Sequence, residues 1–124
     1  MELSRQITSQ AISALVESMD VKTMLVITKR LLPGYNINER TGFPSSLSVP
    51  NRDAAAQIIS DVTSSNRFLE FIALLIQVEQ EGIMGRRYQI KYLPAIVKEV
   101  YSKGYQYSKE FGMFFENPRF KKTR

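Results

Sequence analysis

The chain has 124 residues, 44% of them hydrophobic, which is a common size for one domain and enough to bury one core. It contains no cysteine and no histidine. These absences exclude disulfides, thiolate metal sites and cysteine nucleophiles, and they remove the usual general base and the commonest transition-metal ligand. We therefore predict no catalytic residue, no metal site and no cofactor.

The net charge of +5 is concentrated at one end of the chain. Residues 118–124, PRFKKTR, contain four basic residues and no acid, which leaves 13 basic and 12 acidic residues elsewhere. We predict a near-neutral helical domain over residues 1–116 and a basic tail over 117–124 that begins a linker to a downstream domain. The tail is either a solvated linker or a contact for an anionic surface.

The N-terminal segment does not resemble a targeting signal. Its first twenty residues place charged and amide side chains among the apolar positions, so they lack the continuous apolar centre of a signal peptide. No window reaches about 18 apolar residues without a charge, so no membrane span is predicted. We expect a cytoplasmic protein.

Apolar residues recur at spacings of three and four over residues 3–18, which predicts an amphipathic helix. A second helix is predicted over residues 21–32. Asp20 is its expected N-cap, because a short acidic side chain can accept from the free N–H groups of the first turn. Pro33 and Gly34 end it.

Residues 33–50 are rich in turn formers and have no sustained period. Apolar side chains among them predict an ordered connector held on the outside of the core rather than a flexible linker. The expected anchors are Tyr35, Phe43, Leu47 and Val49. A ligand or partner loop is the alternative.

The next two helices are predicted over residues 51–62, with Asn51 as cap, and over residues 67–81. The second of these is the most apolar stretch, so it is expected at the centre of the fold. Its spacing places Leu74 on the solvent side, either as a lone exposed leucine or, with Gln77, as part of a partner-binding face.

The last third is less regular. Residues 83–94 alternate like a strand, but a lone strand would lack a partner, so a short helix is preferred. A further helix is predicted over residues 94–103, with Pro94 at its first position and Gly104 after its end. The aromatic residues beyond it suit either a short terminal helix or an extended segment. Together these elements predict an all-α, single-domain bundle of five to six helices.

Motifs for chemistry are not found. The sequence has neither G-x-G-x-x-G nor G-x-x-x-x-G-K-[ST], so no phosphate-binding loop of a nucleotide enzyme is indicated. The serines have no histidine partner, and a serine–lysine pair stays open because nothing selects one lysine. We do not expect this domain to be an enzyme, and no small-molecule substrate is indicated.

One stretch interleaves cations and rings: Arg86, Arg87 and Lys91 alternate with Tyr88 and Tyr92. Such a face can hold phosphates and stack bases, so nucleic-acid binding is the alternative function. The other interpretation is that the rings pack inward and the cations are solvated.

The run NRDAAAQIISDVTSSNRFLEFIALLIQ, residues 51–77, resembles the helix-turn-helix core of bacterial effector-associated domains, which are small death-like helical bundles. In both, an alanine-containing helix precedes a polar turn and an aromatic- and leucine-rich helix. The resemblance implies a homotypic or adaptor-type contact in a multidomain signalling protein.

The expected function is therefore a non-catalytic protein-interaction or regulatory module at the N-terminal side of a bacterial signalling protein. A protein partner is expected, including a second copy of the chain. The candidate partner-binding residues are Leu74, Gln77, Arg86, Arg87 and Lys91.

Overall fold

The protein is described from a computed structural model, which covers residues 4–116. This part contains six α-helices, one short 3-10 helix and a two-stranded antiparallel sheet. The predicted all-α class is thereby confirmed. The basic tail over residues 117–124 lies outside the described residues.

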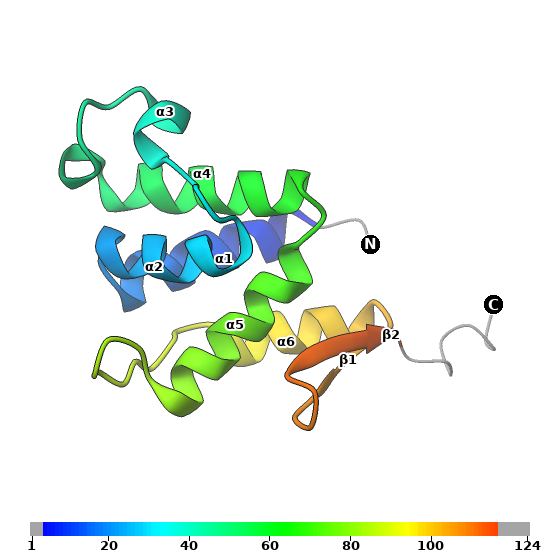
Figure 1. Cartoon of the computed structure of the whole chain (residues 1–124). Helices are drawn as coiled ribbons and strands as arrows, with labels where there is room; N and C mark the ends of the chain where they lie inside the picture. The colour runs from blue at the N-terminus through cyan, green and yellow to red at the C-terminus, as the bar shows by residue number, and fades with distance from the viewer. Residues whose placement is uncertain (1–3, 117–124) are drawn as a thin grey trace.

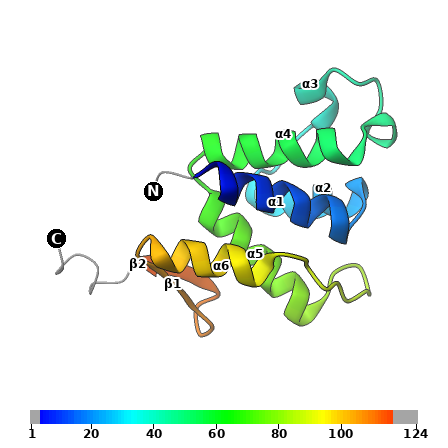
Figure 2. The same cartoon turned by 180° about the vertical axis from the view of Figure 1, so that it is seen from behind.

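The helices form two layers joined by one central helix (Figure 1). The first layer contains α1 (Arg5–Ser18), α2 (Val21–Leu31) and α4 (Asn51–Ser64). The second layer contains α6 (Leu93–Ser102), β1 (Tyr105–Ser108) and β2 (Met113–Glu116). The central helix, α5 (Phe68–Glu81), runs from one layer to the other, and the view from behind shows α1 beside α6 (Figure 2).

Side-chain caps explain where α1 and α2 begin. Ser4 accepts the N–H of Ile7 at 3.2 Å, and Asp20 accepts the N–H of Thr23 at 2.9 Å. Hydrogen bonds from Thr23, together with the charge of Arg86, hold the pKa of Asp20 below its ordinary value. The predicted cap of α2 is confirmed.

The start of α4 differs from the prediction. Pro50, not Asn51, is its N-cap, and no side chain there accepts a backbone N–H. The prediction that Asn51 caps this helix is wrong, because Asn51 is already its first helical residue. A capping side chain belongs to the residue just before the helix, which here is Pro50. Asp53 still lies in the first turn, where a carboxylate is stabilised by the helix dipole.

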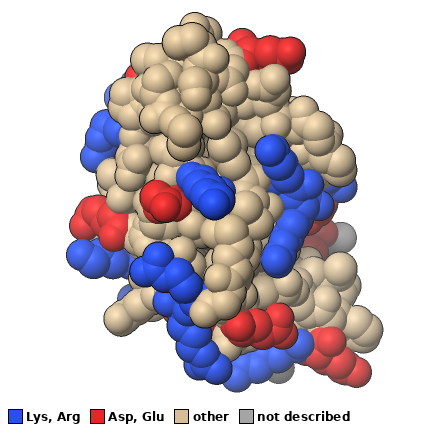
Figure 3. Space-filling view, turned by 60° about the vertical axis from the view of Figure 1, so that its left-hand side comes forward, with Lys and Arg blue, Asp and Glu red and all other residues tan. Residues whose placement is uncertain are grey.

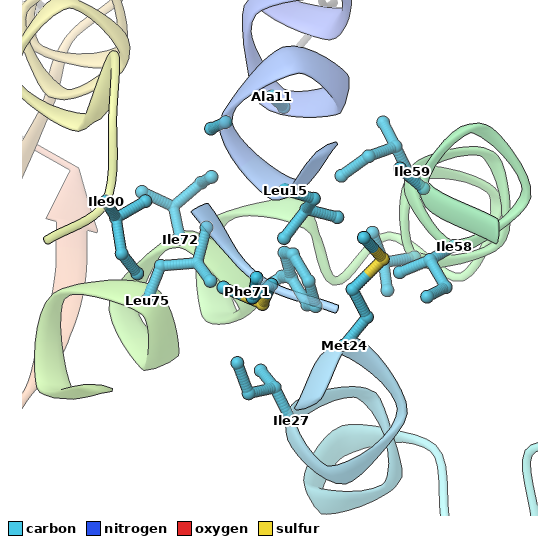
Figure 4. Packing of buried hydrophobic residues seen from close by; sticks show 14 of the residues in the cluster. Ala11, Leu15, Met24, Ile27, Ile58, Ile59, Phe71, Ile72, Leu75 and Ile90 are labelled. Atoms are coloured by element: carbon cyan, nitrogen blue, oxygen red, sulfur yellow. The ribbon is translucent and has the colours of Figure 1, made fainter. Parts of the chain in front are cut away.

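The core forms around α5, as the sequence predicts. Phe71, Ile72 and Leu75 are fully buried, and side chains from α1, α2 and α4 meet them around Phe71 (Figure 4). Fully burying side chains of this size stabilises a fold by about 1.5–3 kcal/mol each. The strongly apolar composition of α5 is thus explained by contacts on most of its sides.

The connector is ordered and carries a short helix, α3 (Ile37–Thr41), and the 3-10 helix η1 (Ser46–Ser48). Tyr35 and Phe43 pack partly buried against the core, and Val49 is buried, so these three predicted anchors are confirmed.

The prediction that Leu47 is the fourth anchor is wrong, because its side chain is 91% exposed. Reciprocal hydrogen bonds between Ser45 and Ser48 close a single turn that leaves Leu47 at its tip, while Val49 takes the buried position after it.

Asp61 on α4 holds the connector by polar contacts. The hydroxyl of Tyr35 donates to Asp61 Oδ2 at 2.6 Å, Arg40 donates to both carboxylate oxygens at 3.1 and 2.8 Å, and Gln57 donates from the preceding turn. Burial alone would raise the pKa of Asp61, but these donors outweigh it and keep the pKa below its ordinary value. The carboxylate therefore ties the connector to α4.

Replacing this carboxylate should weaken the fold. We expect Asp61→Asn to lower the free energy of unfolding at pH 7 by about 1–3 kcal/mol, because Tyr35 and Arg40 lose a charged acceptor. Since the folded pKa is depressed, the contribution is present above the unfolded pKa of about 3.9 and is lost as the pH falls through the folded pKa. Urea unfolding at neutral and acidic pH measures both effects.

The matched control is Asp53→Asn, an exposed carboxyl on the same helix with no side-chain hydrogen bond among residues 4–116. It should lose well under about 1 kcal/mol. Equal losses for Asp61 and Asp53, or a deficit at Asp61 that persists unchanged in acid, would contradict the anchoring role.

The segment between α5 and α6 is not the predicted short helix. Ile83 and Arg86 exchange two backbone hydrogen bonds, at 2.8 and 3.0 Å, around a two-residue turn. Met84 and Gly85 occupy that turn with positive φ values of 51° and 74°, which a helix cannot contain. The chain then stays non-helical up to Leu93, where α6 begins.

The aromatic stretch after α6 forms two strands. Of the two predicted possibilities, a short terminal helix or an extended segment, the extended one is therefore found. β1 and β2 pair antiparallel, with Tyr105 opposite Glu116 and Ser108 opposite Met113. Tyr107 and Phe114 also face each other, with ring centroids 5.3 Å apart. β2 packs on α5 and β1 on α6, so the hairpin is attached to the helices.

Candidate functional site

The predicted partner face on α5 is largely occupied by the chain itself. Leu74 is partly buried and packs against the core, so the expectation that it faces solvent is wrong. Gln77 lies against the hairpin turn, since a Cβ atom on Gly112 would lie 2.6 Å from Gln77 Nε2. The physical reason is the hairpin, which packs along α5 and which helical spacing alone does not predict.

An apolar surface not predicted from the sequence lies on the outside of the same hairpin. Phe111, Met113 and Phe115 are 63%, 46% and 47% exposed. The rings of Phe111 and Phe115 meet edge to face, with centroids 5.8 Å apart. We call these three residues the hairpin face.

Strand alternation produces the hairpin face. Phe114 points toward the core, so its neighbours Met113 and Phe115 point outward. The available sequence signal was the run of three apolar residues in MFFE, because successive side chains of a strand point to opposite faces and cannot all be buried on one side, but this signal applies only once the segment is known to be a strand.

The surroundings of the hairpin face are polar. Gln106 and Ser108 stand opposite Phe115 and Met113 in the register, and neither carries a charge. The turn adds Lys109 and Glu110, both exposed and of opposite charge. The surface thus has an apolar centre, uncharged neighbours on β1 and one charge of each sign at the turn, and an apolar centre with a polar rim is common in protein interfaces.

The predicted cationic face is divided in the structure. Arg86, Arg87 and Lys91 are all exposed, but only Arg86 and Arg87 line a common pocket. Lys91 instead lies beside α1, where its Nζ is 3.7 Å from Glu17 Oε1. The guanidinium of Arg86 lies 5.6 Å from the ring centroid of Tyr88, within cation–π range.

Hydrogen bonds to α1 and α5 hold the segment that carries these cations. The N–H of Ile90 donates to Glu79 Oε2 at 2.8 Å, and the N–H of Lys91 donates to Ser18 Oγ at 2.9 Å. The hydroxyl of Tyr92 donates to Glu17 Oε2 at 2.8 Å, and this bond raises the pKa of Tyr92. The segment is therefore docked at residues 90–92, while residues 84–87 are exposed.

Among residues 4–116, no three acidic, histidine or cysteine side chains gather closely enough to hold a metal ion, and no helix combines the length and apolarity that a membrane span requires. No family model, curated protein or solved structure matches the chain. Function is therefore inferred from the surfaces themselves.

The contact between Glu79 and Ile90 makes a testable prediction about the docked segment. We expect Glu79→Ala to lower the free energy of unfolding by about 1–3 kcal/mol, because it leaves the N–H of a buried residue without its acceptor. The amide of Ile90 should also exchange faster with solvent. Gln80→Ala is the control, since Gln80 is exposed on the same helix and makes no side-chain hydrogen bond within residues 4–116. Equal stability of the two variants would contradict the docking role of Glu79.

Proposed function

We propose that this chain is a non-catalytic protein-interaction module that associates with a second copy of itself through the hairpin face. The observation that carries the proposal is the clustering of Phe111, Met113 and Phe115. The other large exposed apolar residues in the described part, Leu47, Met84, Tyr92 and Tyr101, lie outside the hairpin, and no ring contact joins any two of them. Isolated exposed apolar residues are ordinary, whereas contiguous ones are typical of interfaces.

A second copy fits the chemistry of this face. A two-fold contact places the same surface of each protomer against the other, so apolar side chains meet apolar side chains. The rim also suits this symmetry, because Lys109 of one protomer can meet the partner's Glu110. The turn of the hairpin projects away from the helices in both ribbon views, which leaves room for a second molecule (Figures 1 and 2).

Two further considerations support a protein partner. The resemblance of residues 51–77 to bacterial effector-associated domains implies homotypic or adaptor contacts in a multidomain signalling protein, for which we also propose a cytoplasmic location. The alternative, a nucleic-acid face, has weaker support. The hydroxyl of Tyr88 is within 3.1 Å of that of Thr23, Tyr92 is bonded to Glu17, and Lys91 is paired with Glu17, so the rings and cations are partly engaged inside the chain.

Sedimentation equilibrium tests the proposal directly. The apparent mass of the wild-type chain should rise across about two orders of magnitude of concentration, because association follows mass action. The double variant Phe111→Ser, Phe115→Ser should stay monomeric over the same range. Far-UV circular dichroism would check that it keeps its helices.

The matched control is Leu47→Ser, which removes a still more exposed apolar side chain from a different surface and should associate like the wild type. A wild-type chain that stays monomeric throughout would reject the homotypic proposal. Equal association of the wild type and the double variant would show that the contact lies elsewhere.

A further inference from the structure

A second, polar surface lies at the C-terminal end of α5. It is formed between the last turn of α2 and the turn that follows α5. It is a pocket of about 470 Å³. Its charged side chains are Arg30, Glu81, Arg86 and Arg87. Figure 3 brings forward the side of the molecule on which this turn lies and shows basic side chains close together on its lower part.

Within the described residues, none of the three arginines of this pocket forms an ion pair within 4.0 Å, although the charge of Arg86 reaches Asp20 and lowers the pKa of that carboxyl. The ion pairs found there use Arg40, Arg67 and Lys91 instead. Glu81 forms no ion pair either, so the pocket carries three positive charges against one negative charge. A pocket lined by three arginines and one glutamate is electropositive, so a bound anion would be stabilised there.

The backbone that presents Arg86 and Arg87 is tightly shaped. A Cβ atom on Gly82 would lie 2.6 Å from the carbonyl oxygen of Arg86, so only glycine permits this close approach. The guanidinium of Arg86 rests near the ring of Tyr88, whose hydroxyl lies 3.1 Å from that of Thr23 on α2. One wall of the pocket is therefore pre-organised against the helix that supplies Arg30.

We propose that this pocket binds the terminal phosphate of a phosphate monoester. Guanidinium groups match phosphate by donating pairs of parallel hydrogen bonds, and a monoester offers three terminal oxygens and nearly two negative charges. The pocket is larger than a phosphate group, which leaves space for the group that carries it. Met84, half exposed beside the arginines, offers that group an apolar contact.

A phosphodiester chain fits this surface less well. Nucleic acid is bound along a track of many basic residues, whereas residues 4–116 hold 13 basic and 11 acidic residues in all. One pocket with three arginines favours a single, highly charged group. The proposal does not depend on the hairpin face.

Titration of the isotope-labelled full chain, followed by two-dimensional NMR, tests the site. The probes are inorganic phosphate, phosphoserine and a short single-stranded oligonucleotide. Phosphate and phosphoserine should shift the amide signals of Gly82 and Gly85 and the side-chain Nε–H signals of Arg30, Arg86 and Arg87. Running the titration in the Phe111→Ser, Phe115→Ser background keeps the result separate from self-association.

Variants identify the arginines that bind. Arg30→Gln and Arg87→Gln should each weaken phosphoserine binding by about tenfold or more, because each removes charge-assisted hydrogen bonds. Arg87→Lys should also weaken it, since lysine keeps the charge but not the paired donors. Arg52→Gln, an exposed arginine on α4 outside the pocket, should bind like the wild type.

Each outcome of the titration has a definite meaning. Tighter binding of phosphoserine than of inorganic phosphate would support a phosphorylated side chain of a partner as the source, and the reverse order would support a free phosphate compound. Three results would overturn the proposal: wild-type shifts that do not centre on the pocket, an oligonucleotide that binds more tightly than phosphoserine, or an equal loss from Arg52→Gln. If an arginine variant does not fold, the shifts of the chain that keeps all its arginines decide the case.

Discussion

The structure depends on covering α5. Its residues Phe71, Ile72 and Leu75 are too apolar to face water, and α2 and α4 cover the helix from one side while α6 and β2 cover it from the other. This single requirement positions both surfaces described above. The hairpin face exists because Phe114 turns toward the core and leaves Phe115 outside, and the arginine pocket lies where α5 ends at Gly82.

Local chemistry explains the parts of the fold that could be predicted from the sequence. Helical spacing identified five of the helices to within a few residues, and Asp20 was recognised as a cap because its partner is three residues away. The connector was harder. Its apolar residues correctly indicated anchoring, but only contacts with Asp61, twenty or more residues away, determine where Tyr35 and Arg40 attach. Leu47 shows the same limit, because a turn formed by serines exposes it.

The candidate sites were predicted less well, for a related reason. Arg86 and Arg87 are neighbours in sequence, but Arg30 reaches the same pocket from another helix, and no local pattern indicates that meeting. Lys91 belongs to the same stretch yet points to Glu17. The segment around these residues has a strand-like alternation without a strand partner, because Glu79 and Ser18 accept its backbone N–H groups instead.

Native-state amide hydrogen exchange tests most directly whether α5 organises both the core and the hairpin. A two-stranded hairpin is only marginally stable by itself, so protection of β1 and β2 must come from packing on the helices. The amides paired between Tyr105–Ser108 and Met113–Glu116 should exchange through the same opening, with the same free energy, as the amides of α5. Exchange of those amides at the rate of an unstructured peptide, while α5 stays protected, would contradict the central role of α5.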